Sequence, residues 1–347
     1  MPDFSHLAGP SEEWASYIAK NPLPKVDVIS TEFRRAHNPQ RYAARDAAMK
    51  ALGNHQVTWE TRTIPTSDSL EIPIRVFRSA TQKGHASVLI YYHGGGFLTG
   101  SISTEDPFCI SLARDTGFTV ISVGYRVIPE WKAPTQFHDA WDARTWVINN
   151  AADLGLPQGF DLYVAGTSAG GFLAASVVNR ERENIVDIIS QLGESYIKGQ
   201  LLAAPWLCLP ENFPFDPKVG DKTSHIQWRD ADFLTYPQIE QYRTLMGVPD
   251  EYRDSLLLNP LLFDEKSSIK DLPPTLVMVC GDDPLRDHGL IYEQKLDRLG
   301  VPTKINTYAG YPHVFWIFPD LAMSKTWYRD LIDGIQWLTE KQGHVRN

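Results

Sequence analysis

Five nearly continuous apolar runs place the strongest constraint on the fold of this chain. Each run has the length of a single strand, and apolar residues at consecutive positions indicate a strand that is buried on both faces of a sheet. The runs are SVLIYYH (87–93), FTVISVGY (118–125), FDLYVAG (160–166), GQLLAAPWL (199–207) and PTLVMVCG (274–281). Helical segments separate them. This alternation predicts an α/β fold with a mostly parallel central sheet, flanked by helices and joined by right-handed crossovers.

The segments around these runs extend the same pattern. Residues 57–64 and 72–79 alternate apolar and polar positions on either side of a short polar turn, which indicates a β-hairpin. A last strand is expected at 303–309, before a C-terminal helix near 324–341. The helices between strands are expected at 107–116, 135–150, 168–180 and 287–299. The core is therefore predicted to span residues 56–209 and 263–347.

Two segments fall outside this alternation. Residues 1–55 are expected to be helical, with a first helix capped by Ser11 and a second one at 41–52. Residues 210–262 are aromatic and Pro-rich, and this insertion is too long for an ordinary loop between a strand and a helix. It contains one short amphipathic helix that ends at Gly247. We expect both segments to form a helical cap over the carboxyl edge of the sheet, where open α/β sheets keep their sites.

Charge and cysteine content exclude several classes of function. A net charge of −9 disfavours nucleic acid and anionic membranes as partners. Cys109, Cys208 and Cys280 form no CxxC motif and no cluster with histidine, so we expect buried free thiols and no metal site. No apolar stretch reaches the roughly 18 residues of a membrane span, and the N-terminus lacks the pattern of a signal peptide. A soluble cytoplasmic protein is expected, and a homodimer is compatible with the sequence.

The segment AGTSAGG (165–171) places a serine in the pattern G-x-S-x-G. It follows the run FDLYVAG and opens a helical segment, which is the strand–turn–helix context of a nucleophile elbow. The residues two before and two after such a serine need to lack side chains, as Gly166 and Gly170 do. We therefore predict that Ser168 is a nucleophile above the sheet, beside an unpaired Ala169 amide at a helix N-terminus.

A second glycine-rich stretch, HGGG (93–96), follows an earlier strand. In a fold with a nucleophile elbow, an oxyanion loop is expected at this place. Backbone amides in such a loop stabilise the negative oxygen that acyl transfer creates, and glycines allow that oxygen to approach closely. We predict that Gly94 and Gly95 donate to the oxyanion together with Ala169.

A nucleophilic serine needs a base, and the base needs an orienting carboxylate, in the chain order serine, acid, histidine. His313 follows the strand expected at 303–309 and is the predicted base. Three aspartates follow the strand before it. Asp283 directly follows the strand end and is favoured as the acid, whereas Asp282 and Asp287 stay open on position alone.

The motifs HGGGF, GTSAGG, DPLRDHG and GYPH, with YRVIPEWKAP at 125–134, resemble the hormone-sensitive lipase family of α/β-hydrolase-fold carboxylesterases, in its GTSAG branch. The resemblance covers roughly residues 85–340. It implies that Ser168 is the nucleophile, His313 the base, Asp283 the acid and HGGG the oxyanion hole. It also implies a cap, and hydrolysis of carboxylic esters with short to medium acyl chains, without a cofactor.

Aromatic residues in and near the insertion are predicted to line the pocket for a small-molecule ester. They are Trp206, Phe213, Phe215, Trp228, Phe233, Tyr236 and Trp316. Each of them could instead form the core of the cap, but together they favour an apolar, ring-containing ester over a sugar or a charged substrate. Thr167 replaces the aspartate that is commoner in the family, a change expected to affect substrate shape more than reaction type.

The residues leave more than one function open. The favoured one is a serine carboxylesterase that acts on short- or medium-chain esters or on esters of small apolar metabolites. The same three side chains also serve lactone opening, thioester hydrolysis and acyl transfer, which the sequence does not separate. A non-catalytic small-molecule receptor is disfavoured, because the plant gibberellin receptors, which resemble this family, have lost the histidine that His313 matches.

Overall fold

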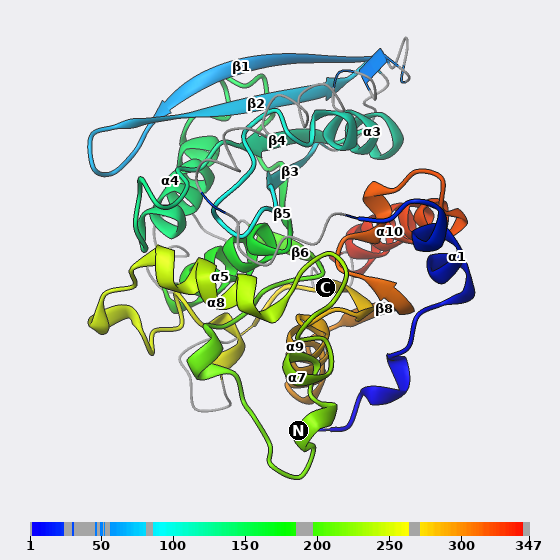
Figure 1. Ribbon diagram of the computed structural model, residues 1–347. Coiled ribbons are helices and arrows are strands. Elements are labelled where there is room, and N and C mark those ends of the chain that lie inside the picture. Colours follow the sequence, from blue (N-terminus) through cyan, green and yellow to red (C-terminus); the bar gives the residue numbers. More distant parts are fainter. Residues whose placement is uncertain are drawn as a thin grey trace.

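The computed structural model describes residues 2–23, 30, 46, 49–50, 52, 56–80, 86–184, 197–263 and 271–342. A central sheet carries helices on both sides (Figure 1). Its strands are β1 (Val57–Pro65), β2 (Glu71–Ser79), β3 (Ser87–Tyr92), β4 (Thr119–Val123), β5 (Asp161–Thr167), β6 (Ile197–Ala203), β7 (Thr275–Asp282) and β8 (Thr303–Pro312). The helices are α1 (Glu12–Lys20), α3 (Asp106–Thr116), α4 (Thr135–Asn149), α5 (Ala169–Glu183), α7 (Ser224–Gln227), α8 (Tyr236–Met246), α9 (Arg286–Arg298) and α10 (Ala322–Gln342). Short 3-10 helices are η1 (Ser5–Leu7), η2 (Pro210–Asn212), η3 (Gly220–Lys222), η4 (Asp250–Tyr252), η5 (Pro260–Leu262) and η6 (Phe315–Ile317).

The sheet has eight strands in the order β1-β2-β4-β3-β5-β6-β7-β8. β1 and β2 form an antiparallel hairpin, from Val57 opposite Ser79 to Pro65 opposite Glu71. β2 also pairs with β4 antiparallel, and every further pair is parallel. The predicted hairpin and the predicted mostly parallel α/β sheet are thus confirmed.

The middle strands are covered on both faces. β4, β5 and β7 are buried at every position. One buried cluster includes Phe137 of α4, Phe172 of α5 and Tyr292 of α9, whereas the other includes Ile110 of α3 and Trp327 of α10. This double cover explains why these strands read as continuous apolar runs. Because β5, β6, β7 and β8 are parallel neighbours, the loops that follow them meet at one edge of the sheet.

The first predicted N-terminal helix is confirmed as α1. Its N-cap is Ser11, whose Oγ accepts a hydrogen bond from the Trp14 amide at 3.1 Å. This bond satisfies one of the amides that a helix start leaves unpaired. The second helix, expected at 41–52, lies mostly outside the described residues.

Residues 210–262 contain α7, α8 and several 3-10 turns. α8 ends at Gly247, which adopts the left-handed conformation of a C-terminal cap at φ 54°, as the sequence predicts. The Trp14 indole Nε1 donates a hydrogen bond to Asp232 Oδ2 at 3.2 Å. The two segments of the predicted cap therefore touch at this point.

The three cysteines are buried free thiols, as predicted. Burial raises the pKa of each thiol above its ordinary value, so each stays protonated and packs as a small apolar side chain. In the part of the chain that the structure describes, no helix combines the length and the apolar character that a membrane span requires.

The N-terminal segment docks against the ends of β7 and β8. The Ser11 amide donates to the Gly310 carbonyl at 2.9 Å, and the Gly9 amide donates to Asp282 Oδ1 at 3.0 Å. Burial raises the pKa of Asp282 to about 6, although the bond from Gly9 and the charge of Arg286 act in the opposite direction. The carboxylate therefore anchors the N-terminal segment while carrying a desolvation cost.

Asp282→Asn tests this cost. With a pKa of about 6, the folded protein binds the proton more tightly than the unfolded chain, in which an aspartate titrates near 4. Stability from this group is therefore present below about pH 4 and is lost as the pH rises through about 6. The asparagine still accepts from Gly9 but carries no charge. We expect the free energy of unfolding of the Asp282→Asn protein to exceed that of the wild type by about 2 kcal/mol at pH 8 and to match it near pH 4.

Urea unfolding, followed by tryptophan fluorescence at the two pH values, measures this difference. Asp320→Asn removes an exposed carboxylate and is the matched control. An Asp282→Asn variant that differs from the wild type by the same amount at both pH values would contradict the electrostatic origin of the effect.

Candidate active site

Ser168 occupies a sharp turn between β5 and α5. Its backbone has φ 56° and ψ −118°, a conformation that is costly for a residue with a side chain. A Cβ on Gly166 would lie 2.1 Å from the backbone of Gly170, and a Cβ on Gly170 would lie 1.9 Å from the Tyr92 carbonyl oxygen. Both glycines are therefore required by the turn, as the sequence pattern predicts.

His313 lies between Ser168 and Asp283. Its Nε2 is 2.9 Å from Ser168 Oγ, and its Nδ1 is 2.7 Å from Asp283 Oδ2. The three residues follow β5, β7 and β8, so sheet topology brings them to one edge. The relative exposures of Ser168, Asp283 and His313 are 7%, 0% and 5%. This burial shields the hydrogen bonds from competing water.

The three aspartates that are candidates for the acid from their sequence position have different hydrogen-bond partners in the structure. Asp283 contacts His313, and its second oxygen, Oδ1, accepts from the Leu285 amide at 2.8 Å. Asp282 holds Gly9 instead. Asp287 accepts from the Ser224 amide at 2.8 Å and from Arg286 Nε at 2.8 Å. Of these three aspartates, only Asp283 contacts the imidazole.

The three amides predicted to bind an oxyanion differ in their hydrogen-bond partners. The Gly94 amide donates to Glu105 Oε1 at 3.2 Å, so in this structure it already has an acceptor within the protein. The Gly95 and Ala169 amides, by contrast, have no hydrogen-bond acceptor among the described residues. Gly95 and Ala169 are therefore the stronger candidates for oxyanion donors, and the role predicted for Gly94 stays a prediction.

Neighbouring residues of the protein leave no room for a side chain at Gly95 or Gly96. A Cβ on Gly95 would lie 2.2 Å from the Thr99 carbonyl oxygen. A Cβ on Gly96 would lie 2.3 Å from the Tyr242 ring, which α8 brings onto the loop. The sequence predicts that these glycines let a substrate oxygen approach, whereas the closeness of Thr99 and Tyr242 already excludes a side chain at Gly95 and Gly96.

A network of side chains, not expected from the sequence, joins the turn that carries Ser168 to the glycine loop at 94–96. The Tyr91 hydroxyl lies 2.9 Å from Thr167 Oγ1 and also donates to the carboxylate of Glu105, which in turn holds the Gly94 amide. Burial, followed by the charge of Glu105, raises the pKa of Tyr91 well above its ordinary value. The only sequence signal for this network is the presence of Thr167 where the family commonly has aspartate.

The aromatic residues predicted to line one pocket lie in several places. Trp206 is in the core, 5.8 Å from Phe97 and 5.6 Å from Phe172 between ring centroids. Trp316 stacks on Trp327 at 4.1 Å. The Phe233 ring contacts Phe318, and the indole nitrogen of Trp228 is buried. Phe213, Phe215 and Tyr236 line a cavity within the insertion. Three of the seven aromatic residues therefore share a cavity and four lie elsewhere, and their predicted role in substrate binding stays a prediction.

The described residues hold no group of three or more His, Cys, Asp or Glu side chains arranged to bind a metal ion. The arrangement instead provides a hydroxyl, an imidazole and a carboxylate in series, beside two unpaired amides. Such a set can take a proton from the hydroxyl and stabilise a negative oxygen nearby.

Known proteins similar to this chain identify its family. The alpha/beta hydrolase fold family matches residues 89–317. Versiconal hemiacetal acetate esterase from Dothistroma septosporum is 30% identical over 287 residues, which cover 80% of this chain and 81% of that protein. Esterase LipI from Mycobacterium tuberculosis is 32% identical over 240 residues, covering 67% and 68%. The crystal structure of vibralactone cyclase is similar with a TM-score of 0.84 and 26% identity, over 97% of this chain and 96% of that one. The chain belongs to the α/β-hydrolase-fold family and, within it, to the hormone-sensitive lipase family, and the relatives named here are esterases by name.

Proposed function

We propose that this protein is a serine carboxylesterase in which Ser168, His313 and Asp283 form the catalytic triad. One observation carries the proposal: the His313 imidazole is within hydrogen-bond distance of both Ser168 Oγ, at 2.9 Å, and Asp283 Oδ2, at 2.7 Å. Because the His313 Nδ1–H donates a hydrogen bond to Asp283, Nε2 is left unprotonated toward the serine. This is the tautomer that a general base needs.

In the acylation step, Ser168 Oγ attacks the ester carbonyl carbon while its proton moves to His313 Nε2. The carbonyl electron pair moves onto oxygen, and the Gly95 and Ala169 amides donate to the resulting oxyanion. When the carbonyl re-forms, the bond to the alcohol breaks and His313 returns the proton to the departing oxygen. An acyl-enzyme on Ser168 remains.

In the second half of the reaction, water attacks the acyl-enzyme. His313 takes a proton from this water and later gives it back to Ser168 Oγ, which releases the carboxylic acid. Asp283 stays ionised throughout and stabilises the imidazolium that forms twice in each cycle. The cycle uses only these side chains and backbone amides, and it needs no cofactor.

The proposed substrates are short- or medium-chain esters, including esters of small apolar metabolites. One relative is by its name an esterase of a hemiacetal acetate, and another is named simply an esterase. We place the ester between the sheet edge and a cap made by α1 and residues 210–262. The hydrogen bond between Trp14 and Asp232, and the contact of Tyr242 with the glycine loop, support this placement.

The similarity to vibralactone cyclase over 97% of this chain supports a second candidate reaction. In this alternative the acyl-enzyme forms in the same way, but a hydroxyl of the acyl group attacks it in place of water, which gives a cyclic ester. The two reactions differ only in the acceptor. Mass spectrometry of the products from a hydroxy-acyl ester distinguishes a ring-closed product from the free hydroxy acid.

Ser168→Ala removes the proposed nucleophile. Without an oxygen to form the acyl-enzyme, kcat/KM for p-nitrophenyl butyrate should fall by at least about 10³-fold. Labelling by a fluorophosphonate should be lost as well. Ser176→Ala, which alters another buried serine on α5, should keep both activity and labelling. Labelling of the Ser168→Ala protein at the wild-type rate would disprove the assignment.

Asp283→Asn tests the orientation of the base. Asparagine can hold the ring in the wrong tautomer, so kcat should fall by roughly 10³- to 10⁴-fold while KM changes little. Asp282→Asn, one residue earlier, is the matched control and should keep near wild-type kcat, because Asp282 contacts Gly9 and not His313. Equal losses in the two variants would contradict the role given to Asp283.

A series of p-nitrophenyl esters from acetate through butyrate and octanoate to laurate tests the proposed substrate class. We expect kcat/KM to be highest for acetate or butyrate and to fall for laurate. A maximum at laurate would identify the protein as a long-chain lipase.

A further inference from the structure

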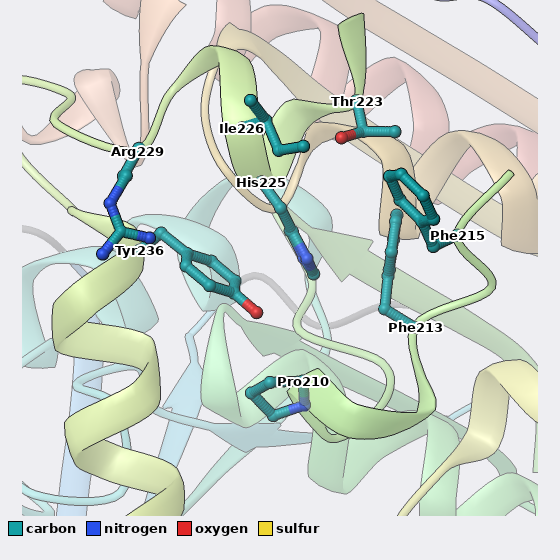
Figure 2. A pocket seen from close by; sticks show the side chains of 8 residues that line it. All are labelled: Pro210, Phe213, Phe215, Thr223, His225, Ile226, Arg229 and Tyr236. Carbon is teal, nitrogen blue, oxygen red and sulfur yellow. The ribbon is translucent and has the colours of Figure 1, made fainter. Parts of the chain in front are cut away.

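A cavity of about 380 Å³ lies within the insertion. Its lining residues are Pro210, Phe213, Phe215, Thr223, His225, Ile226, Arg229 and Tyr236 (Figure 2). The triad and the glycine loop contribute none of these described residues. A volume of this size is within the range of pockets that hold small ligands. We call this cavity the cap pocket.

Aromatic rings form the walls of the cap pocket. The Phe213 ring centroid is 4.0 Å from that of His225, and His225 is 4.6 Å from Tyr236. Phe213 and His225 are buried, whereas Phe215 and Ile226 are exposed and so mark the open side. Flat, apolar walls of this kind favour a ring-shaped occupant, because aromatic faces pack well against another ring.

Thr223 supplies an unsatisfied polar group. The residue is 0% exposed, and its Oγ1 has no hydrogen-bond partner among the described residues. In Figure 2 its hydroxyl oxygen is turned toward the His225 side of the cavity. An unpaired buried hydroxyl is costly, and a ligand oxygen in hydrogen-bond reach removes that cost.

His225 supplies a second donor, which follows from its partner His288. The Leu207 amide donates to His288 Nδ1 at 3.3 Å, so the proton of the neutral His288 ring is on Nε2. Burial lowers the pKa of His225 to about 3 and that of His288 well below its ordinary value, which keeps both rings neutral.

The two rings then have a fixed hydrogen-bond direction. The His288 Nε2–H donates to His225 Nε2 across 2.8 Å. His225 therefore carries its own proton on Nδ1, and no acceptor for that N–H is present among the described residues. Because His225 lines the cavity, this N–H is available to a ligand oxygen there.

Arg229 gives the open side a positive charge. Its side chain is exposed and makes no ion pair with the described residues. Figure 2 shows it next to Tyr236, whose pKa burial raises to about 12, so that the phenol stays neutral. The charge of Arg229 is thus not neutralised from within the pocket, and it favours an anionic group at the entrance.

We propose that the cap pocket binds a small aromatic carboxylate whose ring also bears an oxygen substituent. The ring lies against Phe213 and Tyr236, and the carboxylate pairs with Arg229. The oxygen at the far end of the ring accepts from Thr223 Oγ1 and His225 Nδ1. The cap pocket shares no lining residue with the proposed catalytic site, and its occupation does not depend on the esterase function.

The test uses the full-length protein and 4-hydroxyphenylacetate as the probe, in isothermal titration calorimetry. Phenylacetate lacks the ring oxygen, and 4-hydroxyphenylacetamide lacks the charge. We expect one equivalent of 4-hydroxyphenylacetate to bind, and each analogue to bind about fivefold more weakly. Absence of binding by 4-hydroxyphenylacetate at millimolar concentration would refute the proposal.

Variants assign each interaction to its residue. Arg229→Gln should weaken 4-hydroxyphenylacetate binding about fivefold but leave binding of the uncharged amide unchanged. Thr223→Val should weaken binding of the hydroxylated acid about fivefold and leave phenylacetate unchanged, provided that its melting temperature matches the wild type. Arg298→Gln, an exposed arginine on α9, is the matched control. Equal effects of Arg229→Gln and Arg298→Gln would overturn the proposed pairing.

A final measurement distinguishes the cap pocket from the catalytic site. Ser168→Ala should bind 4-hydroxyphenylacetate with wild-type affinity, and p-nitrophenyl butyrate at saturation should not compete with it. Competition between the two molecules, with one shared stoichiometry, would place the probe at the catalytic site and exclude the cap pocket.

Discussion

The backbone conformation of Ser168 is the constraint on which the proposed site depends. A φ of 56° is unfavourable for a residue with a side chain, and it persists because the surrounding backbone leaves no alternative. The Ser168 amide donates to the Ala203 carbonyl at 2.9 Å, and its own carbonyl accepts from the Phe172 and Trp206 amides at 3.2 Å. Gly170 packs against the Tyr92 carbonyl at the end of β3. β3, β5 and β6 together therefore fix the position of the serine oxygen.

The acid loop is fixed from two sides, and this gives the insertion a part in the geometry of the site. Arg286 is fully buried, and its guanidinium donates to Asp287 Oδ1, to Gln227 Oε1 at 2.7 Å and to the Lys222 carbonyl at 3.1 Å. Ser224 adds a bond from its Oγ to the Pro284 carbonyl at 2.8 Å. Since Asp283 opens this loop, residues 222–227 help to position the carboxylate that orients His313. The insertion thus supports the geometry of the proposed triad as well as forming part of the proposed cap.

The sequence predicted what backbone periodicity and turn chemistry determine. The apolar runs gave β3 to β7 because burial on both faces leaves no polar positions, and the glycines at 166 and 170 gave the elbow because no Cβ fits there. Contacts between particular side chains could not be predicted in this way. The hydrogen bond from the Gly94 amide to Glu105 is one example, because no sequence periodicity indicates it. Trp206 and Trp316 could not be assigned to core or pocket, because an aromatic residue suits both.

The network around Tyr91 connects the turn at Ser168 to the glycine loop, and the proposed reaction uses both. Tyr91 donates to the ionisable carboxylate of Glu105, so its oxygen accepts from Thr167 Oγ1. Glu105 in turn holds the Gly94 amide and so fixes the start of the glycine loop. An aspartate at position 167 would bring a second acceptor to the same hydroxyl, which has one proton to donate, and would place two carboxylates around it. Threonine at 167 and glutamate at 105 are therefore mutually dependent, and the departure from the commoner motif follows from how this protein anchors its glycine loop.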